Sequence, residues 1–199
     1  MRSIAVWICS LCLPALGLAG QFAAGRYTVI LMPGHRYSTL AVQEMGREAA
    51  VILKRSGIDV QLHIGYTREV FEGSLVVVNL RGNCDMEEDS PAAQGGPLGW
   101  THSANGALLP FAELACEPIR AAVQSAPAGL GASRGNAMLG RAMGRVLAHE
   151  LYHIAGETLE HGRDGVAQPS LTAQELTSSQ LQLDREDVAT IQHRLPGSR

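Results

Sequence analysis

The chain has 199 residues, of which 46% are hydrophobic, and carries a formal net charge of −3 at pH 7. This length is enough for one compact domain with its own hydrophobic core, and the sequence shows no internal repeats. The mildly acidic balance gives no support for a nucleic-acid-binding surface or for a polybasic surface that binds membranes.

The N-terminus has the features of a secretory signal peptide. A short positive start precedes an apolar stretch from Ile4 to Leu18, and small residues follow it, so we expect cleavage after Ala19. The stretch is too short for a typical membrane span. We therefore predict a signal peptide at residues 1–19 and a single domain at residues 20–199 with a formal charge of −4. The mature protein is expected to be secreted or periplasmic, with no stable membrane span.

The cysteines agree with export. Of four cysteines, two lie in the predicted signal peptide, which leaves Cys84 and Cys116 in the mature domain. A single pair in an exported domain most simply forms a disulfide, and closing a loop of about 30 residues would stabilise the fold by roughly 3 kcal/mol. A thiolate metal site is the alternative, but neither cysteine belongs to a C-x-x-C pair.

The first half of the mature chain predicts strands around one helix. Arg26–Met32 is rich in β-forming residues and ends at a Pro-Gly turn. Ser38 or Thr39 then caps a helix whose apolar residues recur at helical spacing. Ile58–Ile64 alternates apolar and polar residues, which predicts a half-buried strand. Leu75–Leu80 is a β-branched run typical of a buried central strand.

The second half predicts a hairpin and further helices. Arg81–Gly99 is rich in Gly, Pro, Asp and Glu, which indicates a long loop or flap. The dipeptide Asn105-Gly106 predicts the turn of a β-hairpin. We expect helices at Glu117–Ser125, from Asn136 to Gly156 and at Asp184–Leu195, and Thr172 and Asp184 each stand where a helix N-cap belongs. This order of elements predicts an α+β domain.

The sequence HELYH, from His149 to His153, matches the H-E-x-x-H zinc motif and lies within a predicted helix. Helical positions i and i+4 share one face, so both imidazoles can reach the same ion. Glu150 lies beside them and can act as a base on water activated by the metal. We therefore predict His149 and His153 as Zn²⁺ ligands and Glu150 as the catalytic residue.

A hydrolytic zinc site needs a third protein ligand. We expect His161 in this place, because Gly156 lets the chain leave the helix and the next residues can fold back under the metal. Asp164 and Glu175 lie further along the chain and are the alternatives.

The helix sequence HELYHIAG is similar to the active-site helix of the zincin metallopeptidases. In the metzincin branch the pattern is H-E-x-x-H-x-x-G-x-x-H, and this chain matches it through Gly156. Leu159 stands where metzincins have their third histidine, and no methionine follows Met143 to form their Met-turn. In the gluzincin branch the third ligand is a glutamate on a following helix, a place that Glu175 could take. Glu175 also fits a capping box that begins at Thr172.

This resemblance implies a fold in which a twisted mixed sheet packs against a long helix and the H-E-x-x-H helix. It also implies a zinc metallopeptidase for peptide or protein substrates, with Zn²⁺ on His149, His153 and His161 and with Glu150 as general base. Trp100–His102 could form an edge strand that lines the peptide cleft, or could simply pack at the sheet edge. The alternative functions are a zincin-derived metal-binding or interaction domain without catalytic activity, and a metal hydrolase for other amides. Cleavage specificity and oligomeric state have no signal in the sequence.

Overall fold

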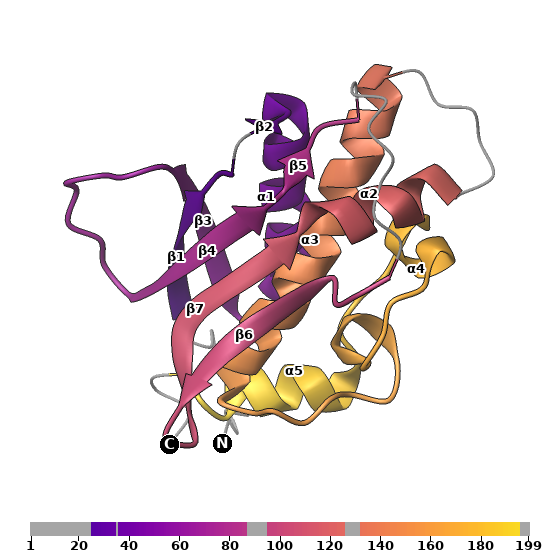
Figure 1. The fold of residues 1–199 in the computed structure, drawn as a ribbon. Coiled ribbons are helices and arrows are strands. Elements are labelled where there is room, and N and C mark those ends of the chain that lie inside the picture. Colours follow the sequence, from indigo (N-terminus) through magenta and orange to yellow (C-terminus); the bar gives the residue numbers. More distant parts are fainter. Residues whose placement is uncertain (1–24, 35, 87–94, 126–131, 196–199) are drawn as a thin grey trace, which may run out of the picture.

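The computed structural model describes residues 25–34, 36–86, 95–125 and 132–195 (Figure 1). The predicted signal peptide lies outside the described residues. The structure is α+β, as the sequence predicts. The strands are β1 (Gly25–Met32), β2 (Arg36–Tyr37), β3 (Ile58–Ile64), β4 (Ser74–Arg81), β5 (Asn83–Cys84), β6 (Gly99–Ala104) and β7 (Ala107–Ala115). The helices are α1 (Thr39–Lys54), α2 (Cys116–Ser125), α3 (Ala132–Gly156), α4 (Ala173–Thr177) and α5 (Arg185–Gln192), with a 3₁₀ turn η1 at Gly165–Ala167.

Five strands form one mixed sheet in the order β3-β1-β4-β7-β6. All neighbours in it are parallel except β6, which pairs antiparallel with β7 and forms one edge. The predicted hairpin turn joins these two strands: Asn105 and Gly106 have φ values of 53° and 80°, as a two-residue hairpin turn requires. The sequence did not predict β2 and β5, which pair with each other and are too short to give a periodic pattern.

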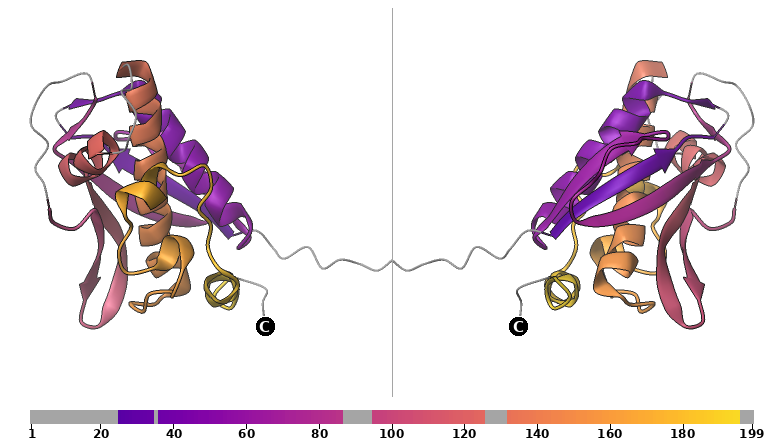
Figure 2. Two further views of the ribbon diagram at one scale, coloured as in Figure 1. Left: turned by 90° about the vertical axis from the view of Figure 1, so that its right-hand side faces the viewer. Right: turned by 90° about the vertical axis from the view of Figure 1, so that its left-hand side faces the viewer.

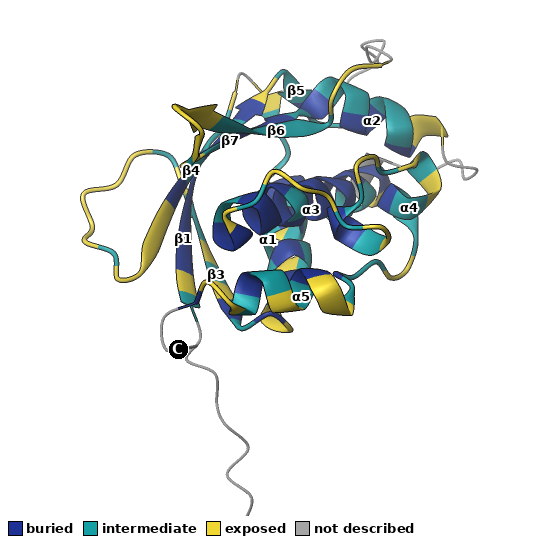
Figure 3. Cartoon of the chain, turned by 90° about the horizontal axis from the view of Figure 1, so that it is seen from below, coloured by how far each residue is buried: buried dark blue, intermediate teal, exposed yellow. Residues whose placement is uncertain are grey.

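Helices α1 and α3 lie side by side across one face of the sheet (Figure 1, Figure 2). Their apolar side chains meet those of the strands in one core. The buried residues of these elements are dark blue in Figure 3. In β4, Val76 and Val78 are fully buried in this core, whereas the intervening Val77 is only partly buried. The β-branched run therefore marks a strand that is central in the sheet, as predicted, but that is fully buried on one face only.

The predicted N-caps of three helices are confirmed. The Ser38 hydroxyl accepts the N–H of Ala41 at the start of α1. Thr172 and Asp184 each begin a full capping box, at α4 and α5. Such caps satisfy backbone N–H groups that have no partner within the helix, so these helix starts follow from local sequence.

The prediction that α3 begins at Asn136 is wrong, because α3 already begins at Ala132. The Asn136 side chain is not available as a cap, since its amide holds the chain that follows β5. Its Oδ1 accepts the backbone N–H of Met86 at 2.9 Å, and its Nδ2 donates to Asp85 Oδ1 at 3.0 Å. Asn136 therefore joins α3 to this distant segment.

The predicted disulfide is confirmed. Cys84 at the end of β5 bonds to Cys116 at the start of α2, and both residues are fully buried. The bond closes a loop with a sequence separation of 32. A buried disulfide is compatible with an oxidising compartment. In the part of the chain that the structure describes, no helix has the length and apolar character to cross a membrane.

Arg145 joins three helices beneath the motif. This fully buried residue lies on α3, one turn before His149. Its Nε donates to Glu48 Oε1 of α1 at 2.8 Å, and its Nη2 donates to the Ser178 carbonyl, just after α4, at 2.9 Å. Nη1 donates to the Ser178 hydroxyl at 3.0 Å and also to the Glu175 carbonyl. One guanidinium therefore satisfies groups of both neighbouring helices.

Arg145→Met is expected to lower the free energy of unfolding by about 3 kcal/mol, because it leaves buried hydrogen-bond partners unsatisfied and Glu48 without its cation. Urea unfolding at neutral pH measures this. The matched control is Arg141→Met, one turn earlier on α3 at a partly exposed position, which should change stability by less than about 1 kcal/mol. Equal losses in the two variants would contradict this account of Arg145.

Candidate metal centre

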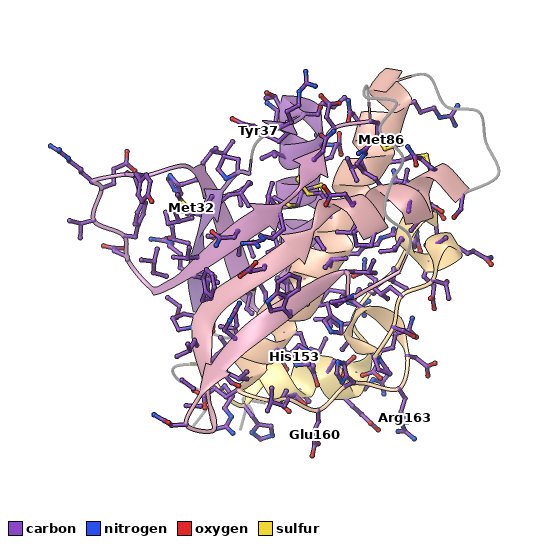
Figure 4. The ribbon with its side chains drawn as sticks, in the orientation of Figure 1. Met32, Tyr37, Met86, His153, Glu160 and Arg163 are labelled. Carbon is purple, nitrogen blue, oxygen red and sulfur yellow. A yellow bond between two sulfur atoms is a disulfide. The ribbon has the colours of Figure 1, made fainter. Side chains whose placement is uncertain are left out.

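His149 and His153 lie one turn apart near the C-terminal end of α3, and their rings converge. The two Nε2 atoms are 3.1 Å apart, and the ring centroids are 4.8 Å apart. Figure 4 shows His153 on α3, with the loop that carries Glu160 and Arg163 passing close to it. The helical spacing of the motif therefore places both imidazoles at one point, as predicted.

Two backbone carbonyls orient these rings. His149 Nδ1 lies 2.8 Å from the carbonyl of Val166, and His153 Nδ1 lies 2.8 Å from the carbonyl of Thr158. A carbonyl can only accept, so each Nδ1 carries the hydrogen and each Nε2 presents a lone pair. The lone pairs of the two Nε2 atoms therefore face one another across 3.1 Å, and a cation bound between them would accept both. Two nitrogen ligands of one tetrahedral zinc ion would be about 3.3 Å apart.

His161 completes the group. Its ring centroid lies 5.2 Å from that of His149 and 4.8 Å from that of His153. One nitrogen from each of the three histidines lies within 4.8 Å of the other two, which is close enough for all three to hold one metal ion. Within the described ranges of the chain, this is the one group of three or more such side chains.

The chain leaves α3 differently from the prediction. Gly156 is the last helical residue, but the left-handed conformation falls on Glu157, whose φ is 47°. The N–H of Thr158 then donates to the His153 carbonyl at 3.1 Å and closes the helix end. Gly156 matters for packing instead, because a Cβ there would lie 3.1 Å from Thr190 Cγ2 of α5. The small residue therefore lets α5 approach the end of α3.

The two alternative ligands lie elsewhere. The Glu175 carboxylate accepts from the Thr172 backbone N–H at 2.8 Å, from the Thr172 hydroxyl at 2.7 Å and from Gln168 Nε2 at 2.7 Å. The hydrogen bond from Gln168, followed by those from Thr172, lowers the pKa of Glu175. Asp164 is the residue before η1. Neither carboxylate belongs to the group of potential metal ligands.

Glu150 is enclosed beside the histidines. Only 3% of the residue is exposed, and its Oε2 accepts the Thr101 hydroxyl of β6 at 2.8 Å. Burial raises the pKa of Glu150 to about 7, and the hydrogen bond from Thr101 opposes this rise. A carboxyl group with this pKa can take up and release a proton near neutral pH.

The imidazoles of His149 and His153 favour their neutral form. Burial lowers the pKa of His149 to about 4, helped by the neighbouring His153 and His161 and opposed by the Val166 carbonyl. Burial likewise lowers the pKa of His153. Metal binding requires neutral imidazole, so these two ligand nitrogens need not lose a proton at neutral pH.

A cavity of about 360 Å³ opens onto this centre. His149, Glu150 and His161 line one part of it. The remaining wall comes from the chain before β6, from Val146 and from the segment Gln168–Leu171, and much of it is apolar. A larger cavity of about 500 Å³ at the start of β1 includes none of these residues in its lining. Of these two cavities, the smaller can bring a ligand to the histidines.

The predicted edge strand contributes through a residue that the sequence did not single out. Thr101, between Trp100 and His102, carries the hydroxyl that reaches Glu150. Trp100 Nε1 donates to His102 Nε2 at 3.1 Å, and the His102 ring packs 4.6 Å from that of Phe111, so these two side chains pack at the sheet edge. A polar residue amid an edge strand is too common a pattern to have identified Thr101.

Asp187 of α5 supports the loop that carries His161. It is 3% exposed, and a Cβ on Gly162 would lie 2.5 Å from Asp187 Oδ1, so α5 packs directly against the residue after His161. Burial raises the pKa of Asp187 to about 6, opposed by a hydrogen bond from the backbone of Asp184. The ionised form therefore destabilises the folded protein.

Asp187→Asn is expected to remove a pH dependence of stability. The folded protein retains the Asp187 proton up to about pH 6 and the unfolded chain loses it near pH 4, so the parent becomes less stable as the pH rises through this window. The difference in unfolding free energy, variant minus parent, should therefore increase by about 1–3 kcal/mol from pH 4.5 to 7. Urea unfolding of metal-free protein measures it. Glu160→Gln, a change at an exposed acid outside α5, is the control, and a difference between Asp187→Asn and the parent that is constant with pH would contradict the prediction.

No protein-family model matches this chain, and no curated protein matches it. What the centre can do therefore follows from its own geometry. The structure brings the sequence-predicted His149, His153 and His161 together, with Glu150 at the same cavity. The described residues could hold a metal ion at this point.

Proposed function

We propose that this chain is an exported zinc-dependent metallopeptidase. The observation that carries the proposal is a cluster of three histidines, two of which, His149 and His161, line a single cavity together with the buried Glu150. A group with this composition can bind a metal and move a proton, which are the two requirements of metal-assisted hydrolysis. The disulfide and the expected signal peptide support the exported location.

Zinc fits the donor set. Three imidazoles are ligands that zinc accepts in a tetrahedral site with one open position, and the spacing of His149 and His153 agrees with such an ion. The Val166 and Thr158 carbonyls orient the two rings as hydrogen-bond partners of zinc ligands usually do. Zinc held by these residues would supply polarisation of the scissile carbonyl and activation of a water molecule.

Glu150 would move the proton. Its carboxylate accepts the proton of the attacking water as oxygen bonds to the carbonyl carbon, and then donates it to the leaving amine nitrogen as the C–N bond breaks. The pKa of about 7 supports both halves of this transfer near neutral pH. Burial of Glu150 also keeps bulk water away from the proton transfer.

Two features support a peptide as the substrate. Among the described residues, strand β6 is an edge of the sheet and lies against α3 at Glu150, so an extended peptide could pair with this edge and pass the histidines. The cavity beside it has apolar walls from Leu98, Val146 and Leu171. These walls would accept an apolar side chain of the substrate next to the cleaved bond.

The test is a joint measurement of zinc content and hydrolysis. The secreted protein is stripped with a chelator and titrated with zinc while the cleavage of an unfolded protein and of a peptide library is followed. We expect activity to be lost with the metal and to return in proportion to zinc, up to one ion per chain. His63→Ala, on β3 outside the centre, should behave like the parent.

The alternatives give different results. Binding of one zinc ion without cleavage of any substrate would contradict the peptidase proposal and favour the non-catalytic metal-binding domain. Cleavage of small amides alone would favour a hydrolase for other substrates. Absence of zinc binding would overturn the metal centre itself.

A further inference from the structure

Strand β6 makes two close contacts with Glu150, one with its side chain and one with its backbone. Thr101 Oγ1 lies 2.8 Å from Glu150 Oε2 and 3.3 Å from the Glu150 backbone carbonyl. Of these two acceptors, the carboxylate oxygen is the nearer and carries the charge, so the Thr101 hydroxyl donates its hydrogen bond to Oε2. Thr101 and Glu150 are 49 residues apart in sequence, so this contact exists only because β6 packs on α3.

Gly99, two residues earlier on β6, lies beside the other carboxylate oxygen. A Cβ at this position would lie 2.8 Å from Glu150 Oε1 and 2.8 Å from Val146 Cγ1. No side chain fits there without moving the carboxylate. Gly99 and Thr101 therefore face the same side of the strand, one leaving room for Oε1 and the other binding Oε2.

We propose that Thr101 is a positioning residue for Glu150, an inference that rests on the proposed function. A glutamate side chain has three rotatable bonds, and a proton-transfer group loses rate when it is free to leave its working position. The Thr101 hydroxyl holds Oε2, which leaves Oε1 for the proton transfer. Since β6 is also the strand along which a peptide would pair, the same strand would align the base and the bond to be cleaved.

Thr101→Val and Thr101→Ser form the matched pair that tests this inference. Valine keeps the size and the β-branched shape but lacks the hydroxyl, whereas serine keeps the hydroxyl. We expect Thr101→Val to lower kcat about 10- to 100-fold with KM nearly unchanged, and Thr101→Ser to stay within about threefold of the parent. Zinc affinity, measured by competition with a chelator, should be the same in all three proteins.

A crystal structure of each zinc-loaded variant supplies a readout that does not depend on activity. We expect the Glu150 carboxylate to leave its place beside Gly99 in Thr101→Val and to keep it in Thr101→Ser. If Thr101→Val does not fold, Thr101→Ala takes its place in both measurements.

Three results would overturn the inference: parent-like kcat in Thr101→Val, an unmoved Glu150 carboxylate in that variant, or loss of zinc from it, which would indicate a structural role. The proposed function has its own test: it would be contradicted if the zinc-loaded parent cleaved no peptide or protein. In that case the crystallographic comparison still decides whether Thr101 holds Glu150.

Discussion

Glu150→Gln is expected to lower kcat for peptide cleavage by about 10³-fold while the protein still binds one zinc ion. Glutamine has nearly the same shape and its amide oxygen can still accept the Thr101 hydroxyl, but it cannot take up a proton. Because burial disfavours the charged carboxylate, the variant should fold at least as well as the parent. Steady-state kinetics and metal analysis of the same sample measure both quantities.

The matched control for this change is Glu160→Gln. Glu160 is an exposed acid in the loop between His153 and His161, so its replacement changes the net charge near the centre by the same amount. We expect parent-like kcat in this control. Cleavage by Glu150→Gln at the parent rate would rule out Glu150 as the general base.

His161→Ala is expected to weaken zinc binding by more than about 100-fold, because loss of a mere hydrogen-bond partner of a ligand already costs about 10- to 100-fold. Glu175→Ala should leave zinc affinity unchanged and lower the free energy of unfolding by about 1 kcal/mol, because Glu175 completes a capping box. Asp164→Ala should leave zinc affinity unchanged. Chelator competition measures all three affinities.

The comparison of these three variants decides which residue is the third ligand. Weak binding in Glu175→Ala with normal binding in His161→Ala would reverse the assignment made from the histidine cluster. Zinc affinity is measured without any substrate, so this result does not depend on the peptidase proposal.

The features predictable from sequence are those that depend on neighbours within a few residues. The caps at Ser38, Thr172 and Asp184 use contacts to residues three positions ahead, and the Asn105-Gly106 turn needs only its own two conformations. The same holds for His149 and His153, which helical geometry brings to one face.

Other features depend on parts of the chain that are distant in sequence. The contact between Thr101 and Glu150 requires β6 to cross α3 in one register, and nothing local to either residue encodes it. The local sequence places the start of α3 at Asn136, a residue type that often caps helices, but its amide bonds to Asp85 and Met86 and the helix begins at Ala132. The approach of His161 depends on a loop path that includes η1 and the contact with α5.

The two carbonyls that orient the histidine rings also restrain the segment of the chain that follows α3. Thr158 and Val166 lie on either side of His161, and each is tied to a ring on α3. A metal ion on the three imidazoles would thus act as a cross-link for the segment from α3 to η1, a part of the chain that the disulfide at Cys84 and Cys116 does not reach. The protein would have two cross-links of different chemistry: reductants would break the disulfide, and chelators would remove the metal ion.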